Sequence, residues 1–149
     1  MPIEYNPFDD DQLAAIRANQ KDPYVQYFII NKDLGMSPGK IAAQIAHAAE
    51  MFAFRYKDLC LIEDVPVKVL PDETLNKLWV TRWWYEESFR KRIKVASKSK
   101  FDRIKKEFDC FLVRDAGLTE IESGSETVLA LWPMLDSSTP KIIKKLRLL

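Results

Sequence analysis

Strand-like and helix-like patterns alternate along the chain. The run Tyr24 to Ile30 is β-branched and aromatic, which is typical of a buried central strand. Residues 37 to about 56 open with Ser-Pro and continue through an alanine-rich stretch, which predicts a long helix. Further strands are expected at 92–96, 108–113 and 126–132, and further helices at 9–20, 72–89, 98–107 and 139–146. Residues 58–70 stay unassigned because prolines interrupt an apolar run there. Strands that alternate with helices predict an α/β layered fold.

The length of the chain fits a single domain. Its 149 residues, 47% of them hydrophobic and 30% charged, suffice for one buried core and are too few for two. We therefore expect one domain over residues 1–149. No apolar run approaches the roughly 20 residues that span a bilayer, and the N-terminus lacks the order of a secretory signal. The expected location is the cytoplasm, without a membrane partner.

Basic residues are concentrated in one part of the chain. The net charge is only +1, yet the segment from Arg82 to Lys106 holds ten Lys and Arg residues against three acidic ones. This concentration favours a surface that faces a polyanion. The alternative is a set of solvated charges on two surface elements.

The turn before the long helix carries an informative motif, residues 33–40, with the sequence Asp-Leu-Gly-Met-Ser-Pro-Gly-Lys. With Ser37 as N-cap, Gly39 and Lys40 take the second and third helical positions. There a glycine costs roughly 0.5–1 kcal/mol relative to alanine, and a cation opposes the helix dipole. A glycine and a lysine at these two unfavourable positions are typical of an anion site built from helical N–H groups and an ammonium. A nucleotide phosphate loop is excluded, because only three residues separate the glycines and an isoleucine follows the lysine.

One face of the same helix is polar. Lys40, Gln44 and His47 fall within about 60° of one another on a helical wheel. A separate apolar flank for the core is made of Ile41, Ile45, Ala48 and Phe52. His47 is the only histidine in the chain. We expect it to be hydrogen-bonded between helix and sheet, where it orients its neighbours; direct catalysis is the alternative.

A second polar group follows a predicted strand at residues 114–119. Asp115 has a glycine two residues on, which permits a sharp turn that projects the carboxylate from the sheet edge. Asp115 is therefore a candidate general base or water-orienting group. Thr119 and Thr127 bracket the turn as candidate hydroxyl donors to a substrate or to Asp115, although such hydroxyls usually bond nearby backbone. We predict that Lys40 and Asp115 meet in one cleft at the carboxyl ends of the first and third strands.

Read together, the polar motifs form a longer pattern. In order and spacing they are Asp33-Leu34-x-Met36-x-x-Gly39-Lys40-x-Ala42-Ala43-Gln44-x-x-His47-Ala48, Arg114-Asp115-Ala116-Gly117-x-Thr119, Thr127-x-Leu129 and Leu146-x-Leu148-Leu149. This pattern resembles the second, archaeal and eukaryotic-type, family of peptidyl-tRNA hydrolases. The resemblance runs from about Tyr24 to the C-terminus and makes residues 24–149 the family domain, with residues 1–23 as a helical extension.

The resemblance implies both a fold and an activity. The fold is a three-layer α/β arrangement with a mixed, mostly four-stranded sheet between helices, usually in a homodimer and without a metal or organic cofactor. The activity is hydrolysis of the ester bond of peptidyl-tRNA. By position, the catalytic residues of the family fall on Lys40, Asp115, Thr119 and Thr127. The residues expected to contact the substrate, including tRNA phosphates, are Gly39, Gln44, His47, Arg90, Lys91 and Arg92.

Three departures from the family pattern stand out. The family commonly has Arg where this chain has Asn31, and Gly-Lys-Gly-Lys where it has Ser37-Pro38-Gly39-Lys40. The segment around 58–80 is longer than the family needs. Loss of cations from the rim of the site weakens the expectation for tRNA affinity more than that for the fold.

The expected mechanism is attack of water on the ester carbonyl. Asp115 orients or deprotonates the water, while Lys40 and the helix N-terminal amides stabilise the oxyanion. Two alternatives belong to other classes. One is a non-catalytic RNA-binding or regulatory protein on the same fold, and the other is a protein-interaction module that uses the aromatic residues around Trp83.

Overall fold

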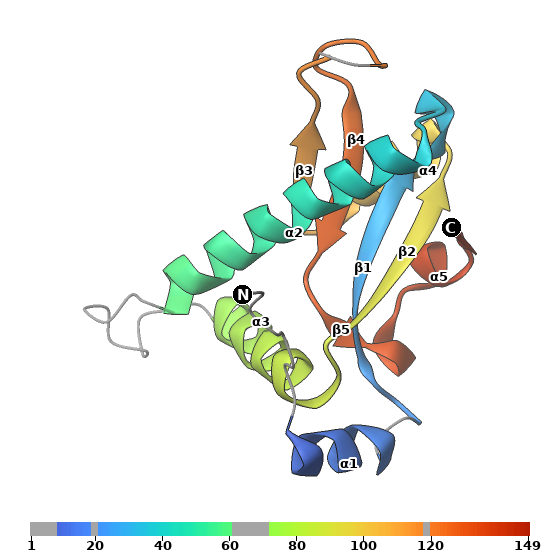
Figure 1. The fold of residues 1–149 in the computed structure, drawn as a ribbon. Coiled ribbons are helices and arrows are strands. Elements are labelled where there is room, and N and C mark those ends of the chain that lie inside the picture. Colours follow the sequence, from blue (N-terminus) through green and yellow to red (C-terminus); the bar gives the residue numbers. More distant parts are fainter. Residues whose placement is uncertain (1–8, 19–20, 61–71, 118–119) are drawn as a thin grey trace, which may run out of the picture.

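The computed structural model describes residues 9–18, 21–60, 72–117 and 120–149 (Figure 1). These residues form five α-helices and six strands. The helices are α1 (Asp10–Ala18), α2 (Pro38–Cys60), α3 (Asp72–Trp83), α4 (Lys98–Glu107) and α5 (Lys141–Lys144). The strands are β1 (Tyr24–Asn31), β2 (Arg90–Ala96), β3 (Cys110–Arg114), β4 (Glu126–Leu131), β5 (Met134–Leu135) and β6 (Arg147–Leu148).

Strand β1 lies at the centre of a mixed sheet with the order β3-β4-β1-β2-β6. Every residue of β1 after Tyr24 is buried, as expected for an apolar run without alternation. β1 pairs in parallel with β2 and antiparallel with β4, and β3 pairs antiparallel with β4. The predicted mixed sheet, with four long strands, is thus confirmed. The two-residue strands β5 and β6 add to it beside β1 and β2.

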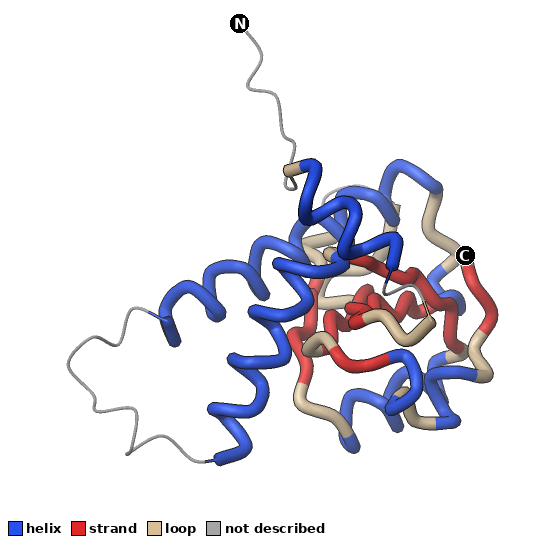
Figure 2. Tube along the Cα trace, turned by 90° about the horizontal axis from the view of Figure 1, so that it is seen from below, coloured by secondary structure: helices blue, strands red, loops and turns tan. Residues whose placement is uncertain are grey.

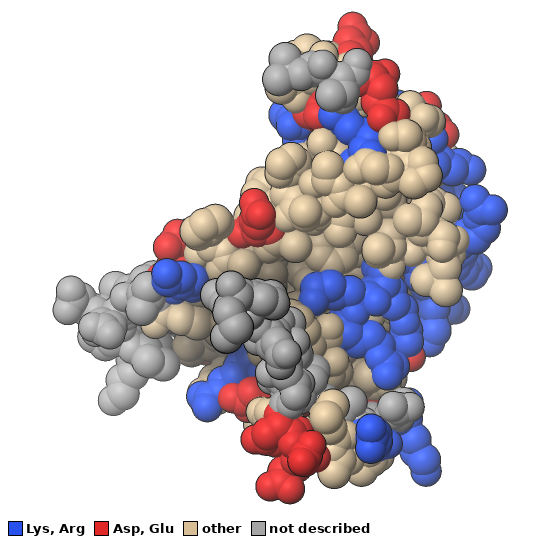
Figure 3. Space-filling view, in the orientation of Figure 1, with Lys and Arg blue, Asp and Glu red and all other residues tan. Residues whose placement is uncertain are grey.

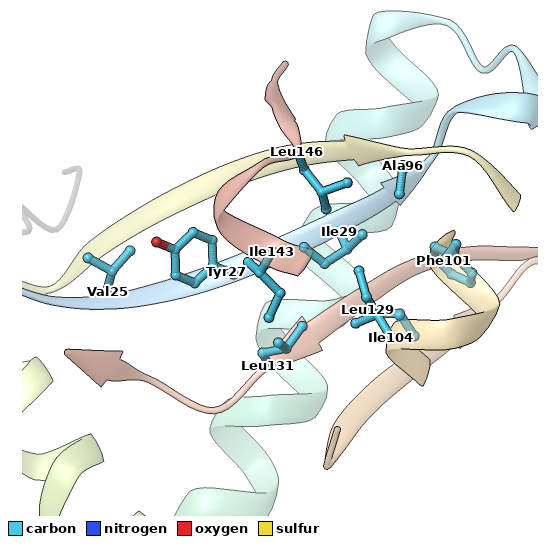
Figure 4. Close-up of a cluster of buried hydrophobic side chains, with 10 residues drawn as sticks. All are labelled: Val25, Tyr27, Ile29, Ala96, Phe101, Ile104, Leu129, Leu131, Ile143 and Leu146. Atoms are coloured by element: carbon cyan, nitrogen blue, oxygen red, sulfur yellow. The ribbon is translucent and has the colours of Figure 1, made fainter. Parts of the chain in front are cut away.

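Helices lie on both sides of the sheet (Figure 2). On one face, Tyr27 and Ile29 of β1 pack with side chains from α4 and from the C-terminal segment around α5 (Figure 4). On the other face, Phe28 and Ile30 pack against α2 through Ala48. Successive β1 side chains alternate between these two clusters, as the pleat of a strand requires. The predicted three-layer α/β fold is confirmed.

Two predicted helices end differently in the structure. The helix expected at 72–89 stops at Trp83, and the chain continues through a π-helical turn, Trp84–Ser88. The buried indole of Trp84 donates a hydrogen bond to the carbonyl of Arg90, and Phe89 closes the turn in the left-handed region at a φ of 50°. The helix expected at 139–146 shortens to α5, which Pro140 precedes, and a 3-10 turn lies at Asp136–Ser138.

The segment expected to be an insertion, residues 58–80, is described only in part. Residues 58–60 are the last residues of α2, which runs past the predicted end near residue 56. Residues 72–80 belong to α3. Residues 61–71 lie outside the described residues, and so do residues 1–8 of the N-terminal extension.

Candidate active site

Lys40 and Asp115 form an ion pair at one edge of the sheet. The Lys40 Nζ lies 2.6 Å from the Asp115 Oδ1, and the two side chains are only 10% and 8% exposed. Lys40 comes from the first turn of α2, and Asp115 directly follows β3. Because β1 and β3 run in the same direction, their carboxyl ends share this edge. The predicted approach of the two groups is confirmed.

A tight loop holds the Asp115 carboxylate. The β3–β4 register shifts between Val113 and Arg114, where Thr127 of β4 has no partner on β3, as in a β-bulge. The Gly117 N–H donates to Asp115 Oδ2 at 2.7 Å. A Cβ on Gly117, which has a φ of 72°, would lie 2.3 Å from the backbone nitrogen of Ser123, so only glycine fits there. The Asp-Ala-Gly sequence therefore fixes one carboxylate oxygen and leaves the other to meet Lys40.

A buried hydrogen-bond relay supports Asp115 from behind. The Gln44 Nε2 donates to Asp115 Oδ1 at 3.1 Å, and the Thr127 hydroxyl donates to Gln44 Oε1 at 2.7 Å. Gln44 and Thr127 are 2% and 0% exposed. Thr127 therefore lies behind the site and orients Gln44, instead of reaching a substrate itself. Thr119, the other predicted threonine, lies outside the described residues.

We expect Thr127→Val to lower kcat about tenfold by releasing Gln44 and misplacing Asp115. It should also lower the free energy of unfolding by about 1–3 kcal/mol, because the buried Gln44 oxygen loses its donor. Single-turnover kinetics and urea unfolding measure the two effects. Thr139→Val is the matched control: its buried hydroxyl bonds Tyr27 at 3.2 Å, far from Asp115, so stability should fall while kcat holds. An unchanged kcat in Thr127→Val would refute the positioning role.

The N-terminus of α2 already holds a carboxylate from the chain itself. Ser37 caps the helix, since its Oγ accepts the Lys40 N–H at 3.2 Å. Glu120 accepts the Ser37 N–H at 2.8 Å and the Ser37 hydroxyl at 2.6 Å. The predicted anion position is therefore occupied by Glu120, which no sequence signal marked. Gly39 is exposed beside it, and Asn31, where the family commonly has Arg, is buried and donates to the Glu126 carbonyl at 3.1 Å.

The expected packing of His47 between helix and sheet is wrong, whereas its expected contact with the substrate stays a prediction. The side chain is exposed on α2 and lines a groove of about 990 Å³ instead of packing between helix and sheet. Lys40, Gln44 and Asp115 line the same groove, so three of the predicted residues do meet His47 in one place. A helical wheel places these side chains on one side of the helix, but it does not show where the sheet beneath them ends.

Arg90, Lys91 and Arg92 do not join this group. They are the first three residues of β2. Val95 of β2 is the residue that lies in one row across the sheet with Ile30, Val128 and Val113, near the strand ends where the ion pair lies. The three basic residues thus lie three to five residues, or roughly 10–17 Å, back along the strand. Arg92 pairs with Asp136 at 2.5 Å, and the Lys91 Nζ lies 3.4 Å from the centroid of the Phe89 ring.

The ion pair sets the protonation of the site. The hydrogen bond from Lys40 lowers the pKa of Asp115 below its ordinary value; partial burial opposes this shift, and the Gly117 N–H reinforces it. Hydrogen bonds from Ser37 likewise lower the pKa of Glu120. Asp115 is therefore ionised near neutral pH and carries the negative charge that Lys40 needs as a partner. Within the described ranges, no group of three or more His, Cys, Asp or Glu side chains is placed to hold a metal ion.

The activity should therefore persist into acid. Because the pKa of Asp115 is lowered, its carboxylate form survives below the ordinary Asp value of about 3.9. We expect kcat/KM to show no acidic limb from Asp115 between neutral pH and about pH 4.5. A pH series of hydrolysis kinetics on the full chain measures this. An acidic limb with a midpoint near pH 6 that disappears in Asp115→Asn would contradict the lowered pKa.

Comparison with known proteins agrees with this geometry. The family model described as "Peptidyl-tRNA hydrolase PTH2" matches residues 24–149, which include every residue of the ion pair and its relay. The chain belongs to this family. Membership in the PTH2 family makes it an ester hydrolase that acts on peptidyl-tRNA. Helix α1 lies before the matched residues.

Curated relatives of the chain are named peptidyl-tRNA hydrolases. A peptidyl-tRNA hydrolase of Thermococcus sibiricus is 33% identical over 131 residues, covering 84% of this chain and 97% of the relative. One of Methanococcus maripaludis is 32% identical over 131 residues, covering 85% and 99%. One of Thermoplasma acidophilum is 34% identical over 126 residues, covering 80% and 93%. These relatives are thus matched over nearly their whole length.

Proposed function

We propose that this chain hydrolyses the ester bond of peptidyl-tRNA at the Lys40–Asp115 pair. The observation that carries the proposal is the contact of Lys40 Nζ with Asp115 Oδ1 at 2.6 Å in a groove, within the range that the family model matches. A cation and a carboxylate at one point supply what ester hydrolysis needs, namely a group that orients water and a group that stabilises an oxyanion.

In the proposed reaction, Asp115 accepts a hydrogen bond from a water molecule and takes its proton as the oxygen attacks the ester carbonyl. Lys40 donates to the oxyanion that forms. The bond between the carbonyl carbon and the ribose oxygen then breaks, and Asp115 returns the proton to the leaving ribose hydroxyl. The low pKa of Asp115 makes it a weak base, so orientation of the water contributes more than proton abstraction.

Gln44 and Thr127 act in this proposal as positioning residues, because they reach the reaction only through Asp115. Gly39 and His47 border the substrate, since both line the groove. No observation on the described residues favours the RNA-binding alternative. Of the aromatic residues named for the protein-interaction alternative, Trp79 and Trp83 are exposed and Trp84 is buried. Thr119 keeps its proposed catalytic role as an expectation from the family pattern alone.

We also propose that tRNA phosphates contact basic residues away from the ion pair, including Arg90, Lys91 and Arg92. Figure 3 shows Lys and Arg gathered on the side of the molecule where β2 and the C-terminal segment lie. A tRNA is long enough to reach that side from the groove. No described helix is both long and apolar enough to cross a bilayer. A homodimer and a cytoplasmic location complete the proposal, as the family implies for both.

The direct test is release of N-acetylated amino acid from charged tRNA by the purified chain. The proposal predicts multiple turnovers that depend on enzyme concentration. A preparation that binds the charged tRNA but releases nothing would support the RNA-binding alternative instead.

A further inference from the structure

The groove that begins at the ion pair continues well beyond it. One wall is the face of α2 that carries Lys40, His47, Met51 and Phe54, and the other wall is the end of β3. Lys40 and Phe54 are 14 positions apart on one helix, which at 1.5 Å per residue is about 21 Å. The groove is therefore far longer than an ester group needs.

The wall formed by β3 exposes backbone groups as well as side chains to the groove. The groove is lined by three consecutive residues of β3, Leu112 to Arg114, and by Asp115 and Ala116 directly after the strand. Successive side chains of a strand point to opposite faces, so an unbroken run of lining residues means that the strand presents its edge. β3 is the terminal strand of the sheet, and in the part of the chain that the structure describes it pairs with β4 alone. Such an edge offers backbone N–H and C=O groups to an added strand.

The far end of the groove is apolar and open. Met51 and Phe54 are 41% and 67% exposed, whereas Phe52 on the same helix is buried against the sheet. Large exposed apolar side chains next to a sheet edge are typical of a surface that another chain covers. Ala43 and Leu112 continue the apolar lining toward the ion pair.

We propose that this groove binds the peptide part of the substrate as an extended strand beside β3. The proposal rests on the function proposed above, because it takes the ester to lie at Lys40 and Asp115. The peptide is the acyl part of that ester. It must therefore extend away from the ion pair over the surface of the protein. At about 3.3 Å per residue, the 21 Å between Lys40 and Phe54 along α2 holds roughly six residues of extended chain, and those nearest the ester lie beside Leu112 to Arg114 of β3.

The charges of the groove favour peptide over nucleic acid. The groove is lined by three carboxylates, Glu50, Asp115 and Glu120, and by two cations, Lys40 and Arg114. Lys40 is paired with Asp115 and Arg114 with Glu126, so the lining carries no excess of positive charge to attract phosphates. The surface over α2 is largely uncharged in Figure 3, and the Lys and Arg side chains gather on another side. An edge strand recognises main chain, which every peptide shares, so the sequence of the stalled peptide matters little.

The test uses acetylated oligoalanyl-tRNA substrates with one to eight residues and the full chain. We expect kcat/KM to rise roughly tenfold up to about six residues and then to level off, as the burial of a few apolar contacts allows. In Phe54→Asp and Met51→Asp the ratio between long and short substrates should fall below about twofold. The matched control is Trp79→Asp, at an exposed aromatic residue of α3, which should keep the full length dependence.

Other results would overturn the inference. Hydrolysis at a rate independent of peptide length would contradict the assignment of the groove to the peptide, but it would not contradict the proposed function. Absence of hydrolysis for every substrate would instead remove the proposed function, and the groove assignment with it. Light scattering gives a further check, because a wild-type dimer that becomes monomeric in Phe54→Asp would assign the groove to contact between copies of this chain.

Discussion

Asp115→Asn is expected to lower kcat by about 10²–10⁴-fold without unfolding the protein. The amide has the size of the carboxylate and can still accept the Gly117 N–H, so the loop should keep its shape. It has no negative charge to orient and deprotonate water, and it no longer holds the Lys40 ammonium. Single-turnover hydrolysis of N-acetylaminoacyl-tRNA at saturating enzyme measures the chemical step.

The matched control is Asp136→Asn. Asp136 is also an ion-paired carboxylate, bonded to Arg92 at 2.5 Å, but it lies toward the other end of the sheet. We expect this variant to lose some stability and to keep the kcat of the wild type. Equal losses of kcat in the two variants would mean that general destabilisation, and not the chemistry of Asp115, explains the effect.

Lys40→Met is expected to lower kcat by about 10²–10³-fold. Methionine keeps the length of the side chain but has no donor for the oxyanion. Removal of the ammonium also removes the main cause of the lowered pKa of Asp115, so that pKa should rise toward its ordinary value. The acidic limb of kcat/KM should then move to higher pH. A pH series of kcat and kcat/KM on this variant measures both changes.

Lys77→Met is the control for this substitution. Lys77 contacts Asp109 at the same Nζ–Oδ distance of 2.6 Å, at a place remote from the groove. The variant should keep both the kcat and the pH profile of the wild type. If Lys40→Met retained the wild-type kcat, the ammonium would be structural, and its proposed role in stabilising the oxyanion would be wrong.

The sequence predicts the pairing of Lys40 with Asp115 because local signals place both groups. Ser37 and Pro38 fix the start of α2 and therefore the position of Lys40 in its first turn. The Asp-x-Gly turn fixes Asp115 at the end of β3. Strands that run in the same direction then bring the two ends together. Each step depends on a rule of local geometry that a sequence displays.

Other residues of the site depend on distances that no local rule gives. His47 shares a helix face with Gln44, but α2 crosses the sheet near its edge, so Gln44 is buried and His47 is exposed. Arg90, Lys91 and Arg92 are basic neighbours in sequence, yet a strand alternates their faces and starts at the far end of the sheet. Glu120 reaches Ser37 across 83 positions of sequence. All three outcomes depend on how segments far apart in the sequence lie against one another, which no local pattern shows.

The most direct test of the account is a double-mutant cycle on kcat with wild type, Lys40→Met, Asp115→Asn and the double variant. Residues that act as one unit are non-additive, so the double variant should be no more than about threefold slower than the slower single variant. That result would show that the pair works as a single catalytic centre. Losses that multiply, or a wild type without turnover on N-acetylaminoacyl-tRNA, would contradict the account.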